Sequence, residues 1–550
     1  MAIQFYKKKI MLPVMLTGML VLGIILGLRL HETNLQRQYL TMQKWNKLNT
    51  ILNYIDKEYV DNIPHKEIEE QSIALILKSL DPHSTYIPAS EMQGTSEPLD
   101  GNFDGIGVLF NMLSDTVVVI NTIPGGPSER VGVAPGDRII TVNNSTIAGC
   151  KISQDSVMKL LRGKSGTRVN VGLKRTGEKN LIPTTITRGK IPIKSVDVAY
   201  MSTPRTGYIK ISKFSRNTYD EFKKAAQKLL SENMQNLIVD LRGNSGGYLD
   251  QAIEVANEFL KPESLIVYTE GKASKRKDFL SDRHGLLLST PVAILIDETS
   301  ASASEVLAGA IQDNDRGMII GRRSFGKGLV QEPVFFNDGS GIRLTVARYY
   351  TPSGRCIQRP YKHSNSSEYY QEIQRRYEHG ELDVADSIKQ NDSLHYLTLG
   401  GRVVYGGGGI TPDIFVPIDT SGINGYYLKI FRKNLIYKYA LQFADANRRA
   451  LNSIKTFADL SQFLRRKNLM SSFAIYASSN GVNGTEEELR VCRNLVRSQI
   501  KAQIGRNTLL DDDGFYPFLE NIDNVLQAAI QTLEKQQQNE HIHANPVRGK

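Results

Sequence analysis

The alternation of apolar and polar positions divides the chain into stretches with different periods. Between residues 35 and 80 the apolar side chains recur at helical spacing, and Asn62-Ile63-Pro64 interrupts the pattern, which predicts two helices. Residues 101–188 instead carry short apolar runs separated by Gly and Pro, which is typical of a small β-domain. The strand-like runs of this stretch are Val117–Ile120, Arg138–Val142 and Val169–Leu173.

Residues 207–416 alternate between strand-like and helix-like patterns, which indicates an α/β core. We expect strands at Tyr208–Ile211, Leu237–Asp240 and Val292–Ile296, and helices at Tyr219–Leu230 and Leu249–Leu260. After residue 419 the spacing is mostly helical, and the polar stretch 536–550 is expected to fray. The chain is therefore predicted to be an α/β multidomain protein with a helical C-terminal region.

One apolar run near the start of the chain suggests a membrane helix. Lys7-Lys8-Lys9 precedes 19 uncharged, mostly apolar residues, Ile10 to Leu28. As a helix this run would extend ~28 Å, close to the ~30 Å thickness of a bilayer's hydrocarbon core. The basic cluster places the N-terminus in the cytoplasm. The exit sequence Leu28-Arg29-Leu30-His31 fits a cleavage site poorly. We therefore favour an uncleaved anchor over a cleaved signal peptide, with the rest of the chain outside the cytoplasm, in the cell envelope (periplasmic).

Charge and cysteine content argue against a nucleic-acid-binding protein and against a protein held together by disulfides or zinc. The formal net charge is +11, but residues 1–30 and 421–550 carry nearly all of the basic excess. A nucleic-acid-binding protein would concentrate its charge on one module, so we expect no nucleic-acid partner. The three cysteines are far apart and lack zinc-ligand spacing, and H-E-x-x-H is absent. Neither a disulfide framework nor a metal site is indicated.

The β-rich stretch contains a turn suited to binding a carboxylate. Gly105-Ile106-Gly107-Val108 is a glycine-rich turn that enters a strand, so consecutive backbone N–H groups are left free for an anion. The strand beside it can pair with an added peptide strand. Together with A-P-G-D-R-I-I-T-V-N at residues 134–143, this turn resembles a PDZ domain. In that resemblance the turn is the carboxylate-binding loop.

Three segments of the α/β core compete as catalytic candidates. Gly243-Asn244-Ser245-Gly246-Gly247 resembles the nucleophile loop of trypsin-like enzymes, but it lies between a strand and a helix and has no His-bearing partner motif. Gly321-x4-Gly326-Lys327 nearly spells a phosphate loop, but Gly328 stands where Ser or Thr would bind Mg²⁺. The third segment, 298–305, places small residues before a helix, where developing negative charge is stabilised. Taken alone, it is equally consistent with a helix cap.

Lys327 favours the catalytic interpretation of the third segment. A lysine desolvated in an apolar pocket can act as the base that a nucleophilic serine requires. S-A-S-A-S-E is followed by F-G-K-G-x-V-Q, whose Lys327 stands 25 residues after the middle serine, Ser302. This pattern is similar to the signature of the carboxyl-terminal processing peptidases, or tail-specific proteases, which are Ser–Lys dyad endopeptidases with an embedded PDZ domain. D-L-R-G-N-S-G-G, L-D-P-H-S-T-Y-I and G-G-I-T-P-D also match, so the resemblance spans residues 35–420.

The resemblance implies a role for each matched residue. Ser302 is the expected nucleophile, Lys327 the general base, and Gln331 the residue that orients the lysine. The expected oxyanion hole is the backbone N–H of Ala303 together with that of Gly246 or Gly247. No metal or organic cofactor is implied.

We expect five segments in the chain. They are a membrane helix at 1–30, a helical region at 31–94, a PDZ domain at 95–190, an α/β serine protease core at 191–420 and a helical region at 421–550. The expected function is a serine endopeptidase that recognises protein C-terminal tails and cleaves through an acyl-enzyme. A homodimer through the N- or C-terminal helical regions is left open. The alternative is a catalytically inactive PDZ scaffold, which loss of Ser302 or Lys327 would have indicated.

Overall fold

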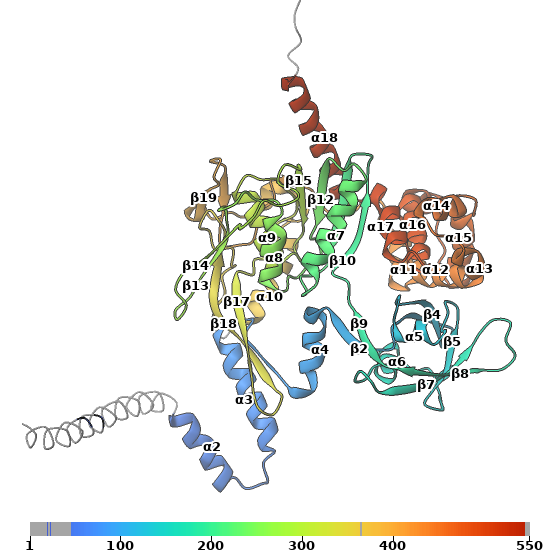
Figure 1. Ribbon diagram of the computed structural model, residues 1–550, viewed down its shortest axis with the longest axis horizontal. Coiled ribbons are helices and arrows are strands. Elements are labelled where there is room, and N and C mark those ends of the chain that lie inside the picture. The colour runs from blue at the N-terminus through green and yellow to red at the C-terminus, as the bar shows by residue number, and fades with distance from the viewer. Residues whose placement is uncertain (1–18, 20–22, 24–45, 363–365, 545–550) are drawn as a thin grey trace, which may run out of the picture. The chain divides into compact units, whose positions relative to one another are not determined.

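The computed structural model describes residues 19, 23, 46–362 and 366–544 (Figure 1). The chain divides into two units, Met1–Leu75 and Ile76–Lys550. In the first unit, α2 (Asn46–Glu58) and the beginning of α3 (His65–Leu80) are the two predicted helices, interrupted around Pro64. The expected membrane helix lies outside the described residues apart from two positions. Among the helices that are described, none combines the length and the apolar character needed to cross a bilayer.

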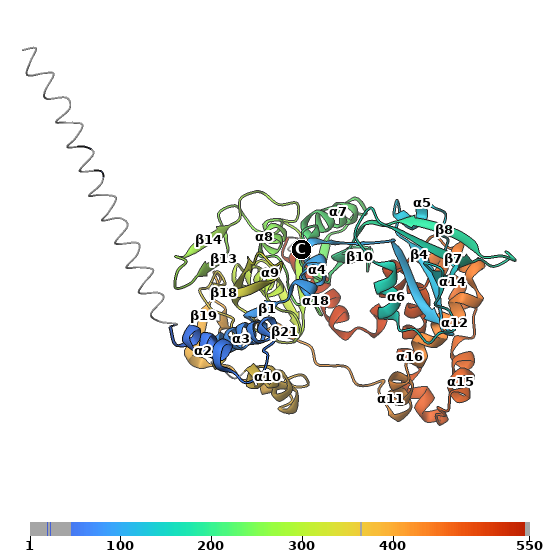
Figure 2. The same ribbon diagram turned by 90° about the horizontal axis from the view of Figure 1, so that it is seen from below.

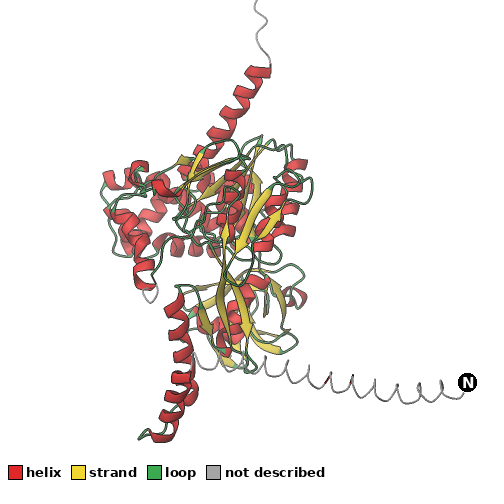
Figure 3. Cartoon of the chain, turned by 90° about the vertical axis from the view of Figure 1, so that its left-hand side faces the viewer, coloured by secondary structure: helices red, strands yellow, loops and turns green. Residues whose placement is uncertain are grey.

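A six-stranded sheet forms the core of the second unit. Its order is β10-β11-β12-β15-β16-β21, and every neighbouring pair is parallel except β10 with β11. Figure 3 shows the strands of the chain as yellow arrows and the helices in red. The strands are β10 (Val196–Met201), β11 (Thr206–Ile211), β12 (Asn236–Asp240), β15 (Val292–Ile296), β16 (Met318–Gly321) and β21 (Ile414–Phe415).

Helices cover both faces of this sheet, which explains why its strands are continuously apolar. α7 (Thr218–Ser231), α8 (Leu249–Asn257) and α9 (Ala303–Asp313) pack on one face, and α18 (Asn524–Ala544) packs on the other. Successive side chains of a strand point to opposite faces, so Leu237 and Val239 join the first core while Ile238 joins the second. Residues 536–544, where the polar sequence leads us to expect fraying, continue α18 as a helix. Residues 545–550 lie outside the described part.

A second sheet lies beside the core. Its order is β1-β18-β13-β14, and β17 also pairs with β18. β17 begins two residues after Lys327, so this sheet carries the segment that follows the predicted base. The strands are β1 (Thr85–Ile87), β13 (Leu265–Glu270), β14 (Lys277–Leu280), β17 (Leu329–Phe335) and β18 (Gly341–Tyr350).

The predicted β-domain has a sheet of its own, with order β3-β4-β5-β7-β8. The three predicted strands are confirmed, and one of them, β5, has the predicted bounds. The chain enters and leaves this domain through two paired strands, β2 (Asn102–Gly105) and β9 (Gly189–Pro192). The elements of the domain are β3 (Val108–Leu113), β4 (Thr116–Thr122), β5 (Arg138–Val142), α6 (Gln154–Leu161), β7 (Arg168–Lys174) and β8 (Ile182–Thr187).

The region after residue 420 divides into two parts. Helices from α11 (Gly425–Arg432) to α17 (Asp512–Leu519) enclose a separate apolar core, whereas α18 returns to the core sheet. The first part lies against the β-domain in both views (Figures 1 and 2). There Leu441 packs on Val118 and Ile120. An ion pair of 2.7 Å joins Arg138 to Asp445 at the same contact. The intervening helices are α12 (Leu435–Ala446), α13 (Arg448–Asn452), α14 (Phe457–Arg465), α15 (Leu469–Ser479) and α16 (Glu486–Arg506).

Candidate active site

Ser302 stands between the end of β15 and the start of α9, at the edge of the sheet where parallel strands end. Ligand sites of open α/β sheets form at this edge. The backbone of Ser302 has φ 58° and ψ −116°, a conformation that costs a non-glycine residue about 1–3 kcal/mol. Two hydrogen bonds to the carbonyl of Asn244 hold the segment, from the N–H of Ala301 at 3.0 Å and the hydroxyl of Ser304 at 2.9 Å. The surrounding structure therefore maintains a strained serine.

The loop after β12 approaches this serine closely. Gly246 has φ +101°, and a Cβ placed on it would lie 2.7 Å from the Cβ of Ser302 and 3.0 Å from the nitrogen of Ala303. Only glycine permits this approach. The N–H of Gly246 donates to Oδ1 of Asn244 at 2.8 Å, so that amide is already engaged. Within the described part of the chain, the N–H groups of Gly247 and Ala303 donate to no other group. Of the predicted oxyanion-hole amides, these two have the required freedom.

Lys327 is held by the residue predicted to orient it. Its Nζ donates to Oε1 of Gln331 at 3.0 Å, and Nε2 of Gln331 donates to the carbonyl of His83 at 2.6 Å. Burial lowers the pKa of Lys327, and the positive charge of Arg343 lowers it further, although Glu305 opposes the shift. The neutral amine that a general base requires is therefore more accessible than in an exposed lysine.

One cavity brings the predicted catalytic residues together. Its volume is about 620 Å³, and its walls come from the two loops, from β17 and β18, and from α4 (Ala89–Asp100). All six residues predicted for the dyad, its orienting group and the oxyanion hole line it: Gly246, Gly247, Ser302, Ala303, Lys327 and Gln331.

Glu305 joins the nucleophile segment to the lysine segment, a role that the sequence reasoning missed. Its buried carboxylate accepts four hydrogen bonds, from the N–H of Ser302 (2.8 Å), Gly326 (2.7 Å) and Lys327 (2.8 Å) and from the hydroxyl of Ser324 (2.5 Å). Burial raises the pKa of this carboxyl, and the four hydrogen bonds oppose that shift. A Glu three residues after a Ser is the sequence sign of a capping box, which reveals only the bond to Ser302.

Two aromatic side chains also lie near the base: His83 stands in the L-D-P-H-S-T-Y-I motif, whereas no sequence motif pointed to Tyr349. The buried hydroxyl of Tyr349, on β18, donates to the carbonyl of Lys327 and interacts with the side chain of Ser302. Burial raises the pKa of Tyr349 well above its usual value, so the hydroxyl keeps its proton. Burial, followed by the charge of Lys327, lowers the pKa of His83 to about 4, which keeps that ring neutral. Nε2 of His83 lies 2.9 Å from the hydroxyl of Tyr369, on α10 (Ser366–Glu378).

The two competing segments lack the surroundings that their chemistry needs. Ser245 is exposed on the loop after β12, and in the described residues no side chain is hydrogen-bonded to it as a base. Lys327 is followed by strand β17 and not by the helix that a phosphate loop requires. Ser245 lines the catalytic cavity but gains no support as a nucleophile, and residues 321–327 gain none as a phosphate loop.

The Gly105–Val108 turn lies at one end of a narrow groove between β3 and α6. The carbonyls of Ile106 and Gly107 accept hydrogen bonds from the N–H groups of Ser128 and Ile123, both at 3.0 Å. The N–H groups of Ile106 and Gly107 donate to nothing else in the described part of the chain. The groove has a volume of about 80 Å³, and its lining includes Val108, Phe110, Met158, Leu161 and Arg162.

Comparison with known proteins gives matches to three sequence families. Residues 205–362 match peptidase family S41, residues 105–186 match the PDZ domain, and residues 426–510 match a family of unknown function, DUF8443. Among solved structures, the photosystem II D1 C-terminal processing protease aligns with 68% of this chain and 86% of its own, at 27% identity and a TM-score of 0.36. The PDZ domain of the carboxy-terminal protease of Vibrio cholerae, solved with a peptide, aligns over 17% of this chain and 99% of its own, at 27% identity and a TM-score of 0.16.

Two relatives from Bacillus subtilis (strain 168) are similar in sequence. The carboxy-terminal processing protease CtpB is 34% identical over 318 residues, which cover 57% of this chain and 65% of CtpB. This chain thus spans somewhat less than two thirds of that relative. The carboxy-terminal processing protease CtpA is 32% identical over 317 residues, which cover 58% of this chain and 67% of CtpA. The PDZ domain precedes the S41 domain along the chain, and the chain belongs to the carboxy-terminal processing proteases of peptidase family S41.

Proposed function

We propose that this protein is a serine endopeptidase of the cell envelope that binds protein C-terminal tails through its PDZ domain and cleaves them with a Ser302–Lys327 dyad. The observation that carries this proposal is the shared cavity, where a strained serine, a desolvated lysine and two unengaged amides meet. The relatives' names and the family matches support the same reaction class.

The catalytic cycle follows from the chemistry of these groups. Neutral Lys327 takes the proton of the Ser302 hydroxyl as Oγ attacks the scissile carbonyl. The N–H groups of Ala303 and Gly247 stabilise the negative oxygen that develops. When the peptide C–N bond breaks, the lysine gives its proton to the leaving amine, and Ser302 is left as an ester. Lys327 then activates a water that hydrolyses this ester and restores the hydroxyl.

The PDZ turn supplies the selection of the tail. A substrate carboxylate at the free N–H groups of Ile106 and Gly107 places the last residues of the tail alongside β3 as an added strand. The apolar side chains that line the groove favour an apolar terminal residue. The location outside the cytoplasm follows from the basic cluster and apolar run of residues 7–28. Homodimerisation stays a prediction.

The direct test of this function is a set of three alanine variants assayed on a fluorogenic peptide. Ser302→Ala and Lys327→Ala should each abolish hydrolysis while circular dichroism stays unchanged, because members of one catalytic unit fail together. Ser245→Ala is the matched control on the neighbouring loop and should retain most of the activity. An inactive Ser245→Ala beside an active Ser302→Ala would overturn the assignment. A wild-type protein that binds tails and never cleaves them would support the scaffold alternative.

A further inference from the structure

The segment between α17 and α18 makes a direct ionic contact with the loop that approaches Ser302. Asp523 lies immediately before α18, and its two carboxylate oxygens accept hydrogen bonds from Arg242. Nη1 donates to Oδ1 at 2.8 Å and Nη2 donates to Oδ2 at 2.6 Å. A bidentate pair of this kind fixes orientation as well as distance.

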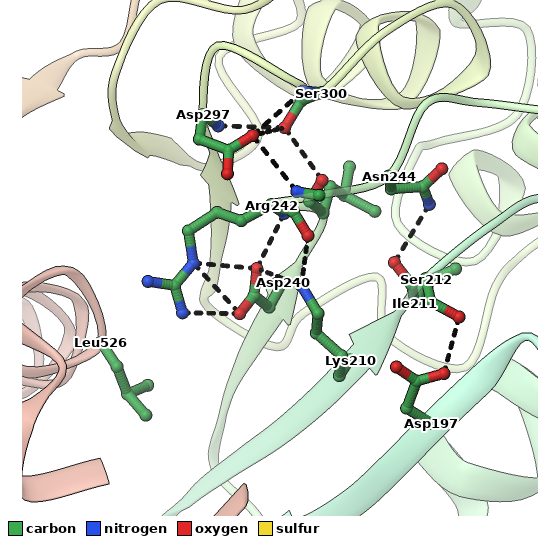
Figure 4. Close-up of polar contacts among 12 residues, drawn as sticks. Asp197, Lys210, Ile211, Ser212, Asp240, Arg242, Asn244, Asp297, Ser300 and Leu526 are labelled. Atoms are coloured by element: carbon green, nitrogen blue, oxygen red, sulfur yellow. Dashed lines mark hydrogen bonds and ion pairs between the residues drawn. The ribbon is translucent and has the colours of Figure 1, made fainter. Parts of the chain in front are cut away.

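The same guanidinium is held on its other side by the end of strand β12. Nε and Nη2 of Arg242 donate to the buried carboxylate of Asp240, which also accepts from Lys210 at 3.1 Å and from the hydroxyl of Tyr208 at 2.7 Å. Burial alone would raise the pKa of Asp240, but the charges of Arg242 and Lys210 outweigh burial and lower it. Figure 4 shows Lys210, Asp240 and Arg242 in contact, with Leu526 of α18 on the side of the guanidinium.

A short stretch of fixed backbone leads from this arginine to the active site. The carbonyl of Arg242 accepts a hydrogen bond from Nζ of Lys210, and the N–H of Gly243 donates to Oδ1 of Asp297 at 3.2 Å. Asn244 then holds Ala301 and Ser304 through its carbonyl. Gly246, whose backbone lies against Ser302, follows two residues later. Arg242 therefore belongs to the same short stretch of backbone as the amide of Gly247.

We infer that Asp523 is a positioning residue for catalysis, which acts through Arg242 to set the loop that carries the Gly247 amide. The inference rests on the proposed function, because it assigns a catalytic consequence to that loop. Asp523 is not among the residues that line the catalytic cavity. Its effect should therefore fall on the chemical step and not on substrate binding.

The choice of substitution separates this role from the role of Asp523 at the start of α18. Oδ1 of Asp523 also accepts from the N–H of Leu526 at 3.0 Å, which caps the helix. Asn caps a helix as well as Asp does, so Asp523→Asn keeps the cap and removes the charge that Arg242 faces. Asp523→Glu keeps the charge on a longer side chain. Asp512→Asn is the matched control, because Asp512 pairs with Arg506 at 2.5 Å and both acidic side chains are 22% exposed.

The experiment measures kcat and KM of the full chain on a fluorogenic peptide, and the inhibition constant of a peptidyl boronate. A boronate forms a tetrahedral adduct with the serine and so reports the oxyanion hole. A displacement of catalytic groups by ~1 Å costs about 100-fold in rate. We therefore expect Asp523→Asn to lower kcat roughly ten- to 100-fold, with KM changed by no more than about twofold. The inhibition constant of the boronate should rise in parallel. Asp523→Glu should recover most of kcat, and Asp512→Asn should match the wild type.

A double-mutant cycle tests the route through Arg242. Lysine lacks the planar fork of arginine, so Arg242→Lys breaks the bidentate pair. Asp523→Asn should then add no further loss to the Arg242→Lys variant, because both changes remove one interaction. The inference is overturned if Asp523→Asn keeps wild-type kcat, if Asp512→Asn loses as much, or if thermal stability falls while boronate affinity is unchanged. An inactive wild type would instead overturn the proposed function.

Discussion

Three charges act on the amine of Lys327: Arg343 lowers its pKa, whereas Glu305 and Asp81 raise it. They act on top of the lowering caused by burial. Since only the neutral amine accepts the proton of Ser302, kcat/KM should rise with pH as Lys327 deprotonates. Arg343→Gln removes a repulsive charge, so the pKa of Lys327 rises and the ascending limb of the pH–rate profile should move to higher pH.

The control for this shift is Arg348→Gln, on the same strand but absent from the charges that act on Lys327. Its profile should superimpose on that of the wild type. A limb that moves to lower pH in Arg343→Gln, or equally in both variants, would contradict the assignment of Lys327 as the base.

The buried carboxylate of Glu305 gives a second prediction at this scale. Glutamine offers one acceptor oxygen and an NH₂ group, so in Glu305→Gln at least one of the four donors faces another donor. A buried donor without an acceptor costs about 1–3 kcal/mol, so the free energy of unfolding should fall by roughly that amount. Activity should fall too, because the bonds to Gly326 and Lys327 position the base. Urea unfolding and kcat measure the two effects.

An exposed glutamate provides the comparison. Glu232 lies at the end of α7, and Glu232→Gln should change neither quantity. Wild-type stability and activity in Glu305→Gln would show that the four hydrogen bonds do not depend on the negative charge.

The catalytic roles of single residues were predictable where the residues stand in a short sequence motif. Ser302, Lys327 and Gln331 stand in short recognisable patterns, and the fold places all three at one cavity. Tyr349 and Arg343 carry no such sign, because they reach the site only through the pairing of β18 with β17. The sequence left two glycine amides, Gly246 and Gly247, as candidates for the oxyanion hole. The choice of Gly247 depends on the hydrogen bond from Gly246 to Asn244, which no pattern of residue types predicts.

At the scale of elements, the PDZ groove makes a prediction about tails. Two peptides identical except for C-terminal amidation should bind the inactive Ser302→Ala chain with different affinity. Loss of the carboxylate leaves the N–H groups of Ile106 and Gly107 unpaired, a penalty of ~1–3 kcal/mol, or roughly five- to 150-fold in Kd. Fluorescence anisotropy measures both constants, and equal affinities would show that this turn does not read the terminus.

Changing the peptide is a sharper test than changing the turn. Gly107 has φ +73°, and a Cβ there would lie 3.0 Å from Cδ1 of Ile191 and 3.3 Å from Cδ of Pro127. A substitution such as Gly107→Glu would therefore introduce backbone strain together with the repelling charge, and would not separate the two.

Strands and helices were predictable because burial of one or both faces requires apolar residues at a regular spacing in the sequence. β5 and β15 have the predicted bounds, whereas the helix predicted to reach Leu260 ends at Asn257 as α8. The polar end of the chain carries no helical period, yet residues 536–544 continue α18 as a helix. Once Val525 to Leu533 are fixed on the sheet, extending the helix costs little, and glutamine is a good helix former.

At the scale of the whole molecule, the charge pattern of the N-terminal segment makes a prediction about membrane topology. The basic cluster and apolar run of residues 7–28 predict that a reporter fused after residue 40 is active only outside the cytoplasm. Alkaline phosphatase and green fluorescent protein fusions are a matched pair, because the first requires export and the second requires the cytoplasm. Mature protein that begins near His31 and is released from the membrane would indicate a cleaved signal peptide.

The position of α18 near the end of the described residues determines when the core sheet can finish folding. Its apolar side chains cover a face of β12, β15 and β16, yet the ribosome makes them only after residues 322–523 have been synthesised. Until then Ile238, Leu295 and Ile320 have no cover and form a surface prone to aggregation. We therefore expect the growing chain to need protection from aggregation during this interval. If Asp523 sets the catalytic loop as inferred, that loop reaches its final shape only after translation has passed residue 523, so we expect the proposed activity to appear only after that point.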